Sequence, residues 1–535
     1  MSKSSNRESL VPKYKFPKLY TDQIVSLQKN PLMKRLKNSR KSYDNDPHRP
    51  IYHYVNPENT LNDPNGLCFW KGFWHLFYQA YPPEDPRQHW GHAISKDLVH
   101  WEDLPYAIYP NPEEACFSGA TLVEEDRVIA MYHGTKVGNM IAISNDDLLL
   151  NWDKINSQKP VIKINSDDGT VLPYRVFDPC IWKKGDFYYS LSGGTLPHIP
   201  TGRRKRSNFL FKSKDLIKWD YIHPFVEGDN FTKIGDDGAC PYFWPIGEDR
   251  YILYFFSHMS GGQALLGDYD KQRDKFIVTS HHEFNFGAAH PGGVHAPSSS
   301  PYQNNKNVVI FNMNNSKDTR GWNQIMTLPR EIGIEGKDKI NRDILSIKPA
   351  GNIESLRSKH VSIKSLEIIP NQEVLLENIS GNSIEINMEV NVDKSPMFEL
   401  RILRSENSEE FTKISFYKNR GFRDWEKYDG WEVNKRLNAS DSIVSIDTSY
   451  SSSDPNVLSR PPESAPVYIK ENENLFLRVF IDKSVVEVFV NERQCLATRI
   501  YPSKKDSLGV SVLSQGAKSE IISLDAYDMD SIYDD

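Results

Sequence analysis

The chain is poor in cysteine and has no long apolar run. Its 535 residues include only five cysteines, an odd number that is low for the length, so no framework of disulfides is expected. No cysteine or histidine cluster has the spacing of a zinc site, and no stretch of about 18 apolar residues could cross a bilayer. The sequence therefore predicts a protein with no metal, no cofactor and no membrane partner.

An excess of charge is also missing. The 65 Lys and Arg residues nearly balance the 71 Asp and Glu residues, for a net charge of −6, which excludes a general attraction to nucleic acid. The first twenty residues lack the apolar segment of a secretory signal, so we expect a cytoplasmic location. Residues 1–49 are polar and basic; we interpret them as a leader, either solvated or folded as a short helix on the surface, with a binding arm as the alternative.

Aromatic residues are abundant, at 12% of the chain, and they recur in a pattern. Five short aromatic or β-branched segments each follow a turn signal: residues 73–80, 127–134, 186–194, 250–257 and 307–314. A second motif, with Leu followed by Trp, comes after three of them, at 95–104, 144–155 and 213–222. Strand-rich repeats of this length predict a five-bladed β-propeller over residues 50–345.

The pattern changes after residue 345. Residues 346–365 are predicted to be a linker, and residues 366–535 alternate apolar and polar side chains at period two. Such alternation indicates antiparallel strands with one buried face, as in a β-sandwich. The predicted fold is therefore all-β, a propeller followed by a sandwich.

One carboxylate, Asp63, lies in the stiff segment Asn62-Asp63-Pro64-Asn65-Gly66, which predicts a rigid turn before a strand. In the other repeats the corresponding positions hold Phe117-Ser118, Asp178, Ala239 and His295. Asp178, like Asp63, directly precedes a proline. Since the inner strands of a propeller converge, the two carboxylates are expected to meet in one pocket. A carboxylate pair in an aromatic pocket suits the hydrolysis of glycosides.

These segments resemble glycoside hydrolase family 32, the invertases, levanases and inulinases. The resemblance runs from His53 to about residue 525 and includes 62–66, 75–79, 90–101, 117–120, 321–331 and 481–491. It implies the same propeller and sandwich, with Asp63 as nucleophile and Asp178 as stabiliser of the transition state. It also implies a pocket wall of Asn62, Gln79, Trp90, Phe117 and Ser118.

The sequence departs from the family pattern at the pocket. Phe177 replaces an Arg, Ala239 replaces the Glu that acts as acid and base, and Tyr242 replaces an Asp. Thr60 stands where a Trp is usual, and His295 where a Tyr is common. We expect Phe177, Ala239, Tyr242 and His295 to line the substrate site.

Three explanations of these departures stay open. Asp237 could supply the missing proton if it shares a strand face with Ala239, and His290 and His295 are further candidates. The substrate could instead differ, with the basic loop 202–206 binding an anionic group on it. The third explanation is a glycan-binding pseudoenzyme without hydrolytic activity. We predict a retaining glycosidase of the β-fructofuranosidase type with a carbohydrate substrate, and a sandwich domain that could carry a homodimer contact.

Overall fold

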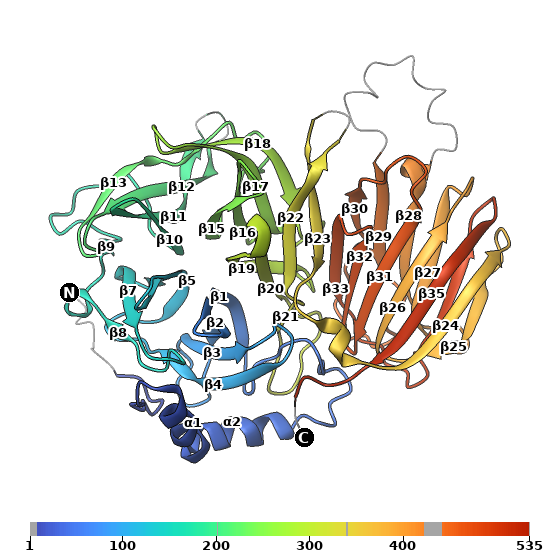
Figure 1. The fold of residues 1–535 in the computed structure, drawn as a ribbon, viewed down its shortest axis with the longest axis horizontal. Coiled ribbons are helices and arrows are strands. Elements are labelled where there is room, and N and C mark those ends of the chain that lie inside the picture. Colours follow the sequence, from blue (N-terminus) through green and yellow to red (C-terminus); the bar gives the residue numbers. More distant parts are fainter. Residues whose placement is uncertain (1–7, 199, 201, 339–340, 422–440, 534–535) are drawn as a thin grey trace.

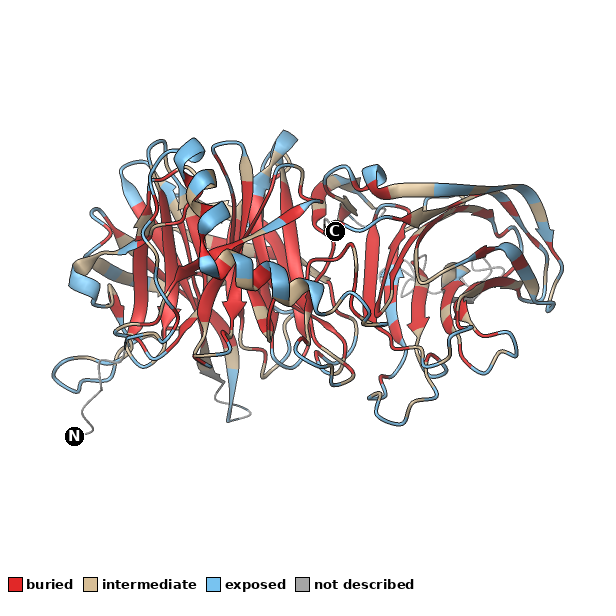
Figure 2. Ribbon diagram, turned by 90° about the horizontal axis from the view of Figure 1, so that it is seen from below, coloured by how far each residue is buried: buried red, intermediate tan, exposed pale blue. Residues whose placement is uncertain are grey.

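The computed structural model describes residues 8–198, 200, 202–338, 341–421 and 441–533. Strands account for nearly all of its regular structure, and they form two bodies, a ring of sheets and a sandwich (Figure 1). The predicted fold class, an all-β propeller followed by a β-sandwich, is confirmed. Buried residues fill the strands of the ring, whereas the outer strands of the sandwich and the N-terminal helices show intermediate and exposed residues (Figure 2).

The ring consists of five antiparallel sheets, apart from one short parallel edge. The first contains β1 (Leu61–Trp70), β2 (Phe73–Ala80), β3 (His89–Ser95) and β4 (Trp101–Ile108). The second contains β5 (Cys116–Val123), β6 (Val128–Gly134), β7 (Gly138–Ser144), β8 (Asp153–Lys154) and β9 (Ile162–Lys163). The third contains β10 (Pro179–Lys184), β11 (Phe187–His198), β12 (Arg203–Ser213) and β13 (Trp219–Pro224).

The last two sheets complete the ring. The fourth contains β14 (Val226–Glu227), β15 (Ala239–Ile246), β16 (Arg250–Ser257), β17 (Gly261–Asp270) and β18 (Lys275–Glu283). The fifth contains β19 (Val294–Tyr302), β20 (Lys306–Met313), β21 (Ile325–Met326), β22 (Arg330–Lys337) and β23 (Asp343–Pro349). Short 3-10 turns lie at η1 (Asn156–Gln158), η3 (Gln303–Asn305), η4 (Ile353–Leu356) and η5 (Lys418–Gly421).

The first strands of the sheets close a circle. β1 contacts β5, β5 contacts β10, β10 contacts β15, β15 contacts β19, and β19 contacts β1 again. These inner strands surround the axis of the ring in Figure 1. Equivalent positions on these strands therefore lie around one axis.

Irregular pairing marks four of the inner strands at the same place. Their registers shift between Leu61 and Pro64, Cys116 and Gly119, Ala239 and Tyr242, and Val294 and Pro297. Bulges of this kind bend a strand and re-aim its side chains. The segment 62–66 was predicted to be a turn before a strand. The structure instead shows that it is the bulged start of β1. Gly66, at φ +51°, permits its sharp backbone bend.

The second body has two six-stranded sheets. One contains β24 (Arg357–Ile368), β26 (Ser383–Asn391), β31 (Leu475–Asp482), β32 (Val485–Val490), β33 (Gln494–Arg499) and β35 (Ser519–Met529). The other contains β25 (Val374–Ser380), β27 (Met397–Arg404), β28 (Thr412–Tyr417), β29 (Ser442–Asp447), β30 (Glu463–Val467) and β34 (Gly509–Ser514). The connector between the two bodies is shorter than the predicted range 346–365, because β24 begins inside that range.

The N-terminal segment folds against the first sheets. Helices α1 (Tyr20–Lys29) and α2 (Pro31–Lys41) lie beside β3 and β4 in Figure 1. Arg40 of α2 makes two hydrogen bonds to the carboxylate of Asp103 in β4, at 2.8 and 2.9 Å. Of the two forms expected for the leader, this segment takes the helical one.

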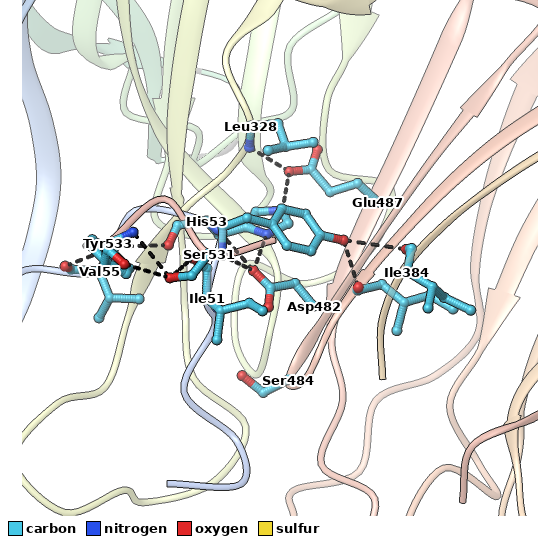
Figure 3. A network of polar contacts seen from close by, with 12 residues as sticks. Ile51, His53, Val55, Leu328, Ile384, Asp482, Ser484, Glu487, Ser531 and Tyr533 are labelled. Atoms are coloured by element: carbon cyan, nitrogen blue, oxygen red, sulfur yellow. Dashed lines mark hydrogen bonds and ion pairs between the residues drawn. The ribbon is translucent and has the colours of Figure 1, made fainter. Parts of the chain in front are cut away.

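Buried charges join the two bodies (Figure 3). His53, just before β1, places Nδ1 2.9 Å from Asp482 and Nε2 3.2 Å from Glu487, both in the sandwich. Glu487 also lies 2.8 Å from Arg330 of β22. All four side chains are fully buried, so each charge depends on its partners for solvation.

Candidate active site

Asp63 is held in the bulge of β1 with its two carboxylate oxygens in different surroundings. Oδ2 accepts hydrogen bonds from Ser118 at 2.7 Å and from Gln79 at 3.2 Å. Oδ1 is buried and accepts no hydrogen bond from the residues that the structure describes, although Nδ1 of His295 lies 3.7 Å away. One oxygen thus fixes the carboxylate, and the other keeps its lone pairs for another partner.

An amide chain orients these contacts. Asn62 donates from Nδ2 to Gln79 at 3.2 Å and accepts at Oδ1 from Asn312 at 3.1 Å. Gln79 also donates to Ser118 at 2.7 Å. The chain joins β1, β2, β5 and β20, so the position of Asp63 is set by three sheets together.

Asp178 meets Asp63 across a thiol that the sequence analysis did not single out. Sγ of Cys240 lies 3.6 Å from Oδ2 of Asp63 and 3.7 Å from Oδ2 of Asp178. Both Asp178 and Cys240 have positive φ, 31° and 48°, which is costly for residues other than glycine. Cys240 directly follows Ala239, a predicted site residue, and this position could have pointed to it.

The two carboxylates have opposite pKa shifts. Burial and the nearby charge of Asp63 raise the pKa of Asp178 to about 7. Burial acts in the same direction on Asp63, but its contacts with His295 and Ser118 outweigh burial and lower its pKa. At neutral pH Asp63 is therefore ionised, while Asp178 titrates. This division suits a carboxylate pair with two different roles.

An apolar cluster lies beside the carboxylates. Ala239 is fully buried with Cys240, Phe256 and Ala296, and Phe177 packs against this group. Ala239 and Phe177 were both predicted to line the substrate site, and they adjoin each other. Together they make this side of the site apolar.

Three other predicted site residues have supporting contacts. Trp90 is fully buried and donates from Nε1 to the backbone carbonyl of Phe117 at 2.9 Å, so it positions the half-buried Phe117. Tyr242 is also buried; its hydroxyl donates to Gly119 at 2.8 Å and accepts from the amide of Gly66 at 3.0 Å. The structure therefore uses Trp90 and Tyr242 to join inner strands.

The hypothesis that Asp237 shares a strand face with Ala239 is wrong, because β15 begins at Ala239. Gly238, at φ +66°, turns the chain between them. The carboxylate of Asp237 instead lies 2.5 Å from Nδ1 of His258, a residue that the sequence analysis missed. The ring of His258 stands edge-on to His295, with centroids 5.9 Å apart.

The basic residues 202–206 lie at the turn and start of a hairpin strand, not in a free loop. Arg206 is buried and pairs with Asp229, and Lys205 donates to the Asp229 carbonyl at 2.8 Å. Arg204 is exposed. Two of the basic side chains are thus committed inside the fold.

Within the described ranges, no three His, Cys, Asp or Glu side chains are grouped so as to hold a metal ion. In the same part of the chain, all five cysteines are buried and unpaired. None of the helices described there has the length and apolar character needed to traverse a bilayer.

A propeller whose inner strands bring two unlike carboxylates together has the architecture and chemistry of a glycosidase. Comparison with known families agrees. Residues 53–349 match the "Glycosyl hydrolases family 32 N-terminal domain", and residues 352–528 match the "Glycosyl hydrolases family 32 C terminal" domain. The chain belongs to glycosyl hydrolase family 32.

Curated relatives of the chain are fructosidases. It is 26% identical to the levanase of Bacillus subtilis, over 92% of this chain and 72% of the levanase. It is also 26% identical to the sucrose-6-phosphate hydrolase of Escherichia coli, over 88% of this chain and 94% of that enzyme. These relatives support the hydrolase type.

Solved structures show the same fold. Fructan 1-exohydrolase IIa of Cichorium intybus, in complex with 1-kestose, superposes with a TM-score of 0.75 at 22% identity. The match covers 91% of this chain and 98% of that one. The exo-inulinase of Aspergillus awamori superposes with a TM-score of 0.71 at 20% identity, over 91% and 99% of the two chains.

Proposed function

We propose that this protein is a retaining glycoside hydrolase of the β-fructofuranosidase type, with Asp63 as nucleophile. The observation that carries the proposal is the asymmetry of the Asp63 carboxylate, which is fixed at Oδ2 and unbonded at Oδ1. Oδ1 is the atom that attacks the anomeric carbon. The lowered pKa of Asp63 keeps its carboxylate ionised for that attack.

Asp178 has the second role. An oxocarbenium-like transition state develops positive charge, which an adjacent ionised carboxylate stabilises. Because the pKa of Asp178 is about 7, this assistance grows as the pH rises through neutrality. Asn62, Gln79 and Ser118 hold the nucleophile, and Phe117 and Phe177 contribute the pocket wall.

The substrate is a carbohydrate whose recognition differs from the family pattern. Phe177 in place of an arginine removes a guanidinium group that could bind the sugar with two hydrogen bonds. Ala239 and His295 change the other side chains that line the pocket. An anionic sugar is one such substrate, and the similarity to a sucrose-6-phosphate hydrolase favours it. Exposed Arg204 is the group we assign to the anion.

A second candidate function is a catalytically impaired glycan-binding protein on the same fold. The buried Ala239 favours it, because no carboxylate extends from that position. The five unpaired cysteines favour a reducing, cytoplasmic location for either function. A homodimer formed through the sandwich domain completes the proposal; sedimentation measurements test it.

The test of the proposed function is Asp63→Asn, assayed on sucrose, fructans and aryl β-D-fructofuranosides. We expect all turnover to fall by at least about 10³-fold, since the amide neither attacks nor carries charge. Methanol added to the wild type should give the methyl β-fructoside, the product of retention. Turnover unchanged in the variant, or a product of inverted configuration, would contradict the proposal. Binding of sugars without turnover by the wild type would favour the second function.

A further inference from the structure

We propose that His258 is the proton donor to the leaving group and that Asp237 is its positioning residue. This inference rests on the proposed function, because it supplies the acid that the reaction at Asp63 requires. The two residues come from the turn after β16 and from the segment before β15. They meet at the edge of the site.

The contact between them fixes the imidazole. Nδ1 of His258 lies 2.5 Å from Oδ2 of Asp237, and the His258 amide donates to Oδ1 at 3.4 Å. With Nδ1 bonded to the carboxylate, Nε2 is the nitrogen left to donate. Within the described part of the chain, no hydrogen-bond partner meets Nε2. A carboxylate-bound histidine with one free nitrogen is a common arrangement for proton transfer.

His258 also has the right place relative to the nucleophile. Its ring is 5.9 Å from the ring of His295, and His295 lies 3.7 Å from the free oxygen of Asp63. Its side chain is 67% exposed, whereas that of Asp63 is 8% exposed. The donor therefore lies on the solvent side, where a leaving group departs and where the donor can be reprotonated.

The surrounding charges favour the imidazolium. The hydrogen bond to Asp237 raises the pKa of His258, and the charges of Asp63 and Asp178 add to this against partial burial. His295, in β19 of the fifth sheet, faces His258, and His290 contacts His295 in turn, with ring centroids 5.6 Å apart.

Other candidates fit the role less well. Asp237 has its carboxylate engaged by His258. His295 lies against the nucleophile Asp63, whereas the proton donor must be next to the oxygen of the leaving group. Burial and the neighbouring histidines lower the pKa of His290, so it holds an acidic proton less readily than His258, whose pKa is raised.

The steps balance with water as the only reactant besides the glycoside. As Oδ1 of Asp63 forms a bond to the anomeric carbon, the glycosidic bond breaks, and the proton on Nε2 of His258 passes to the departing oxygen. Neutral His258 then takes a proton from the water that attacks the glycosyl ester of Asp63. Sugar, free carboxylate and imidazolium are the result.

The test compares leaving groups in His258→Ala. For sucrose, whose leaving alcohol is poor, we expect kcat/KM to fall by about 10²–10⁴-fold. For 4-nitrophenyl β-D-fructofuranoside, which needs little protonation, kcat/KM should stay within a few-fold of wild type. The parameter kcat/KM is used because it excludes the later hydrolysis of the ester. Asp237→Asn should lower the pKa of the alkaline limb of the sucrose pH profile.

The control is His100→Ala, in the turn between β3 and β4 of the first sheet. His100 is also exposed, and its Nδ1 lies 2.8 Å from Asp97, so the variant removes a similar pair away from the site and should leave both substrates unaffected. Equal losses of kcat/KM on both substrates in His258→Ala, or no loss on sucrose, would overturn the inference. Unchanged aryl turnover in Asp63→Asn would instead refute the proposed function.

Discussion

At the scale of single residues, the ionisation of Asp178 links the site to stability. Its pKa is about 7 in the folded protein and about 3.8 for the free side chain. A raised pKa for an acid means that the folded state retains the proton. The contribution of Asp178 to stability is therefore fully present below pH 3.8 and is lost as the pH rises through 7.

Asp178→Asn should remove this loss. We expect the free energy of unfolding of the variant to exceed that of the wild type by about 2–4 kcal/mol at pH 8, and by much less at pH 4. Chemical denaturation at the two pH values measures the difference. A gain of equal size at both would show that titration of Asp178 is not its cause. The same variant should lose activity, since the amide cannot stabilise an oxocarbenium ion.

At the scale of elements, one position in each inner strand or just before it builds the site. Four strands bulge there, and β10 begins immediately after Asp178. Recurrent turns support the sheets from outside: Leu98, Leu149 and Leu216, in the Leu-Trp motif, all have positive φ, between 52° and 69°. The motif recurs because one turn geometry recurs.

This regularity explains what the sequence could reveal. Strands at 73–80 and 250–257 were predicted to the residue, because aromatic residues and turn signals bound them. The convergence of Asp63 and Asp178 also followed from repeat position. The bulge in β1 could not be predicted from the sequence, since Pro64 and Gly66 suit a turn equally well. His258 was missed because its partnership with Asp237 joins residues 21 apart that only the fold brings together.

The apolar cluster around Ala239 predicts the outcome of introducing a glutamate at that position. Ala239→Glu would place a third carboxylate in the apolar cluster with Phe256 and Cys240, beside the thiol that already contacts Asp63 and Asp178. We expect a loss of about 2–5 kcal/mol in the free energy of unfolding. Ala239→Val is the apolar control, and adding Phe177→Arg should recover part of the loss through pairing. An Ala239→Glu variant as stable as wild type and faster on sucrose would contradict this.

At the scale of the whole molecule, His53 bridges the propeller and the sandwich through Asp482 and Glu487. Burial opposes its charge, but hydrogen bonds to Asp482 and Glu487 prevail and raise its pKa. Stability from this pair of contacts is therefore fully present below pH 6.5 and is lost as the pH rises through the folded pKa. The interface is strongest when the imidazole is charged.

Replacement of His53 by Phe should cost stability in a pH-dependent way. Asp482 keeps hydrogen bonds from the amides of Ile51 and Tyr52, and Glu487 keeps Arg330, yet both lose the imidazolium. We expect a loss of about 3–5 kcal/mol at pH 6 and a smaller one at pH 9. The control is His75→Phe, because burial lowers the pKa of His75 to about 3 and keeps it neutral at both. Calorimetry decides: if the losses for His53→Phe are the same at pH 6 and pH 9, the charge of His53 does not join the domains.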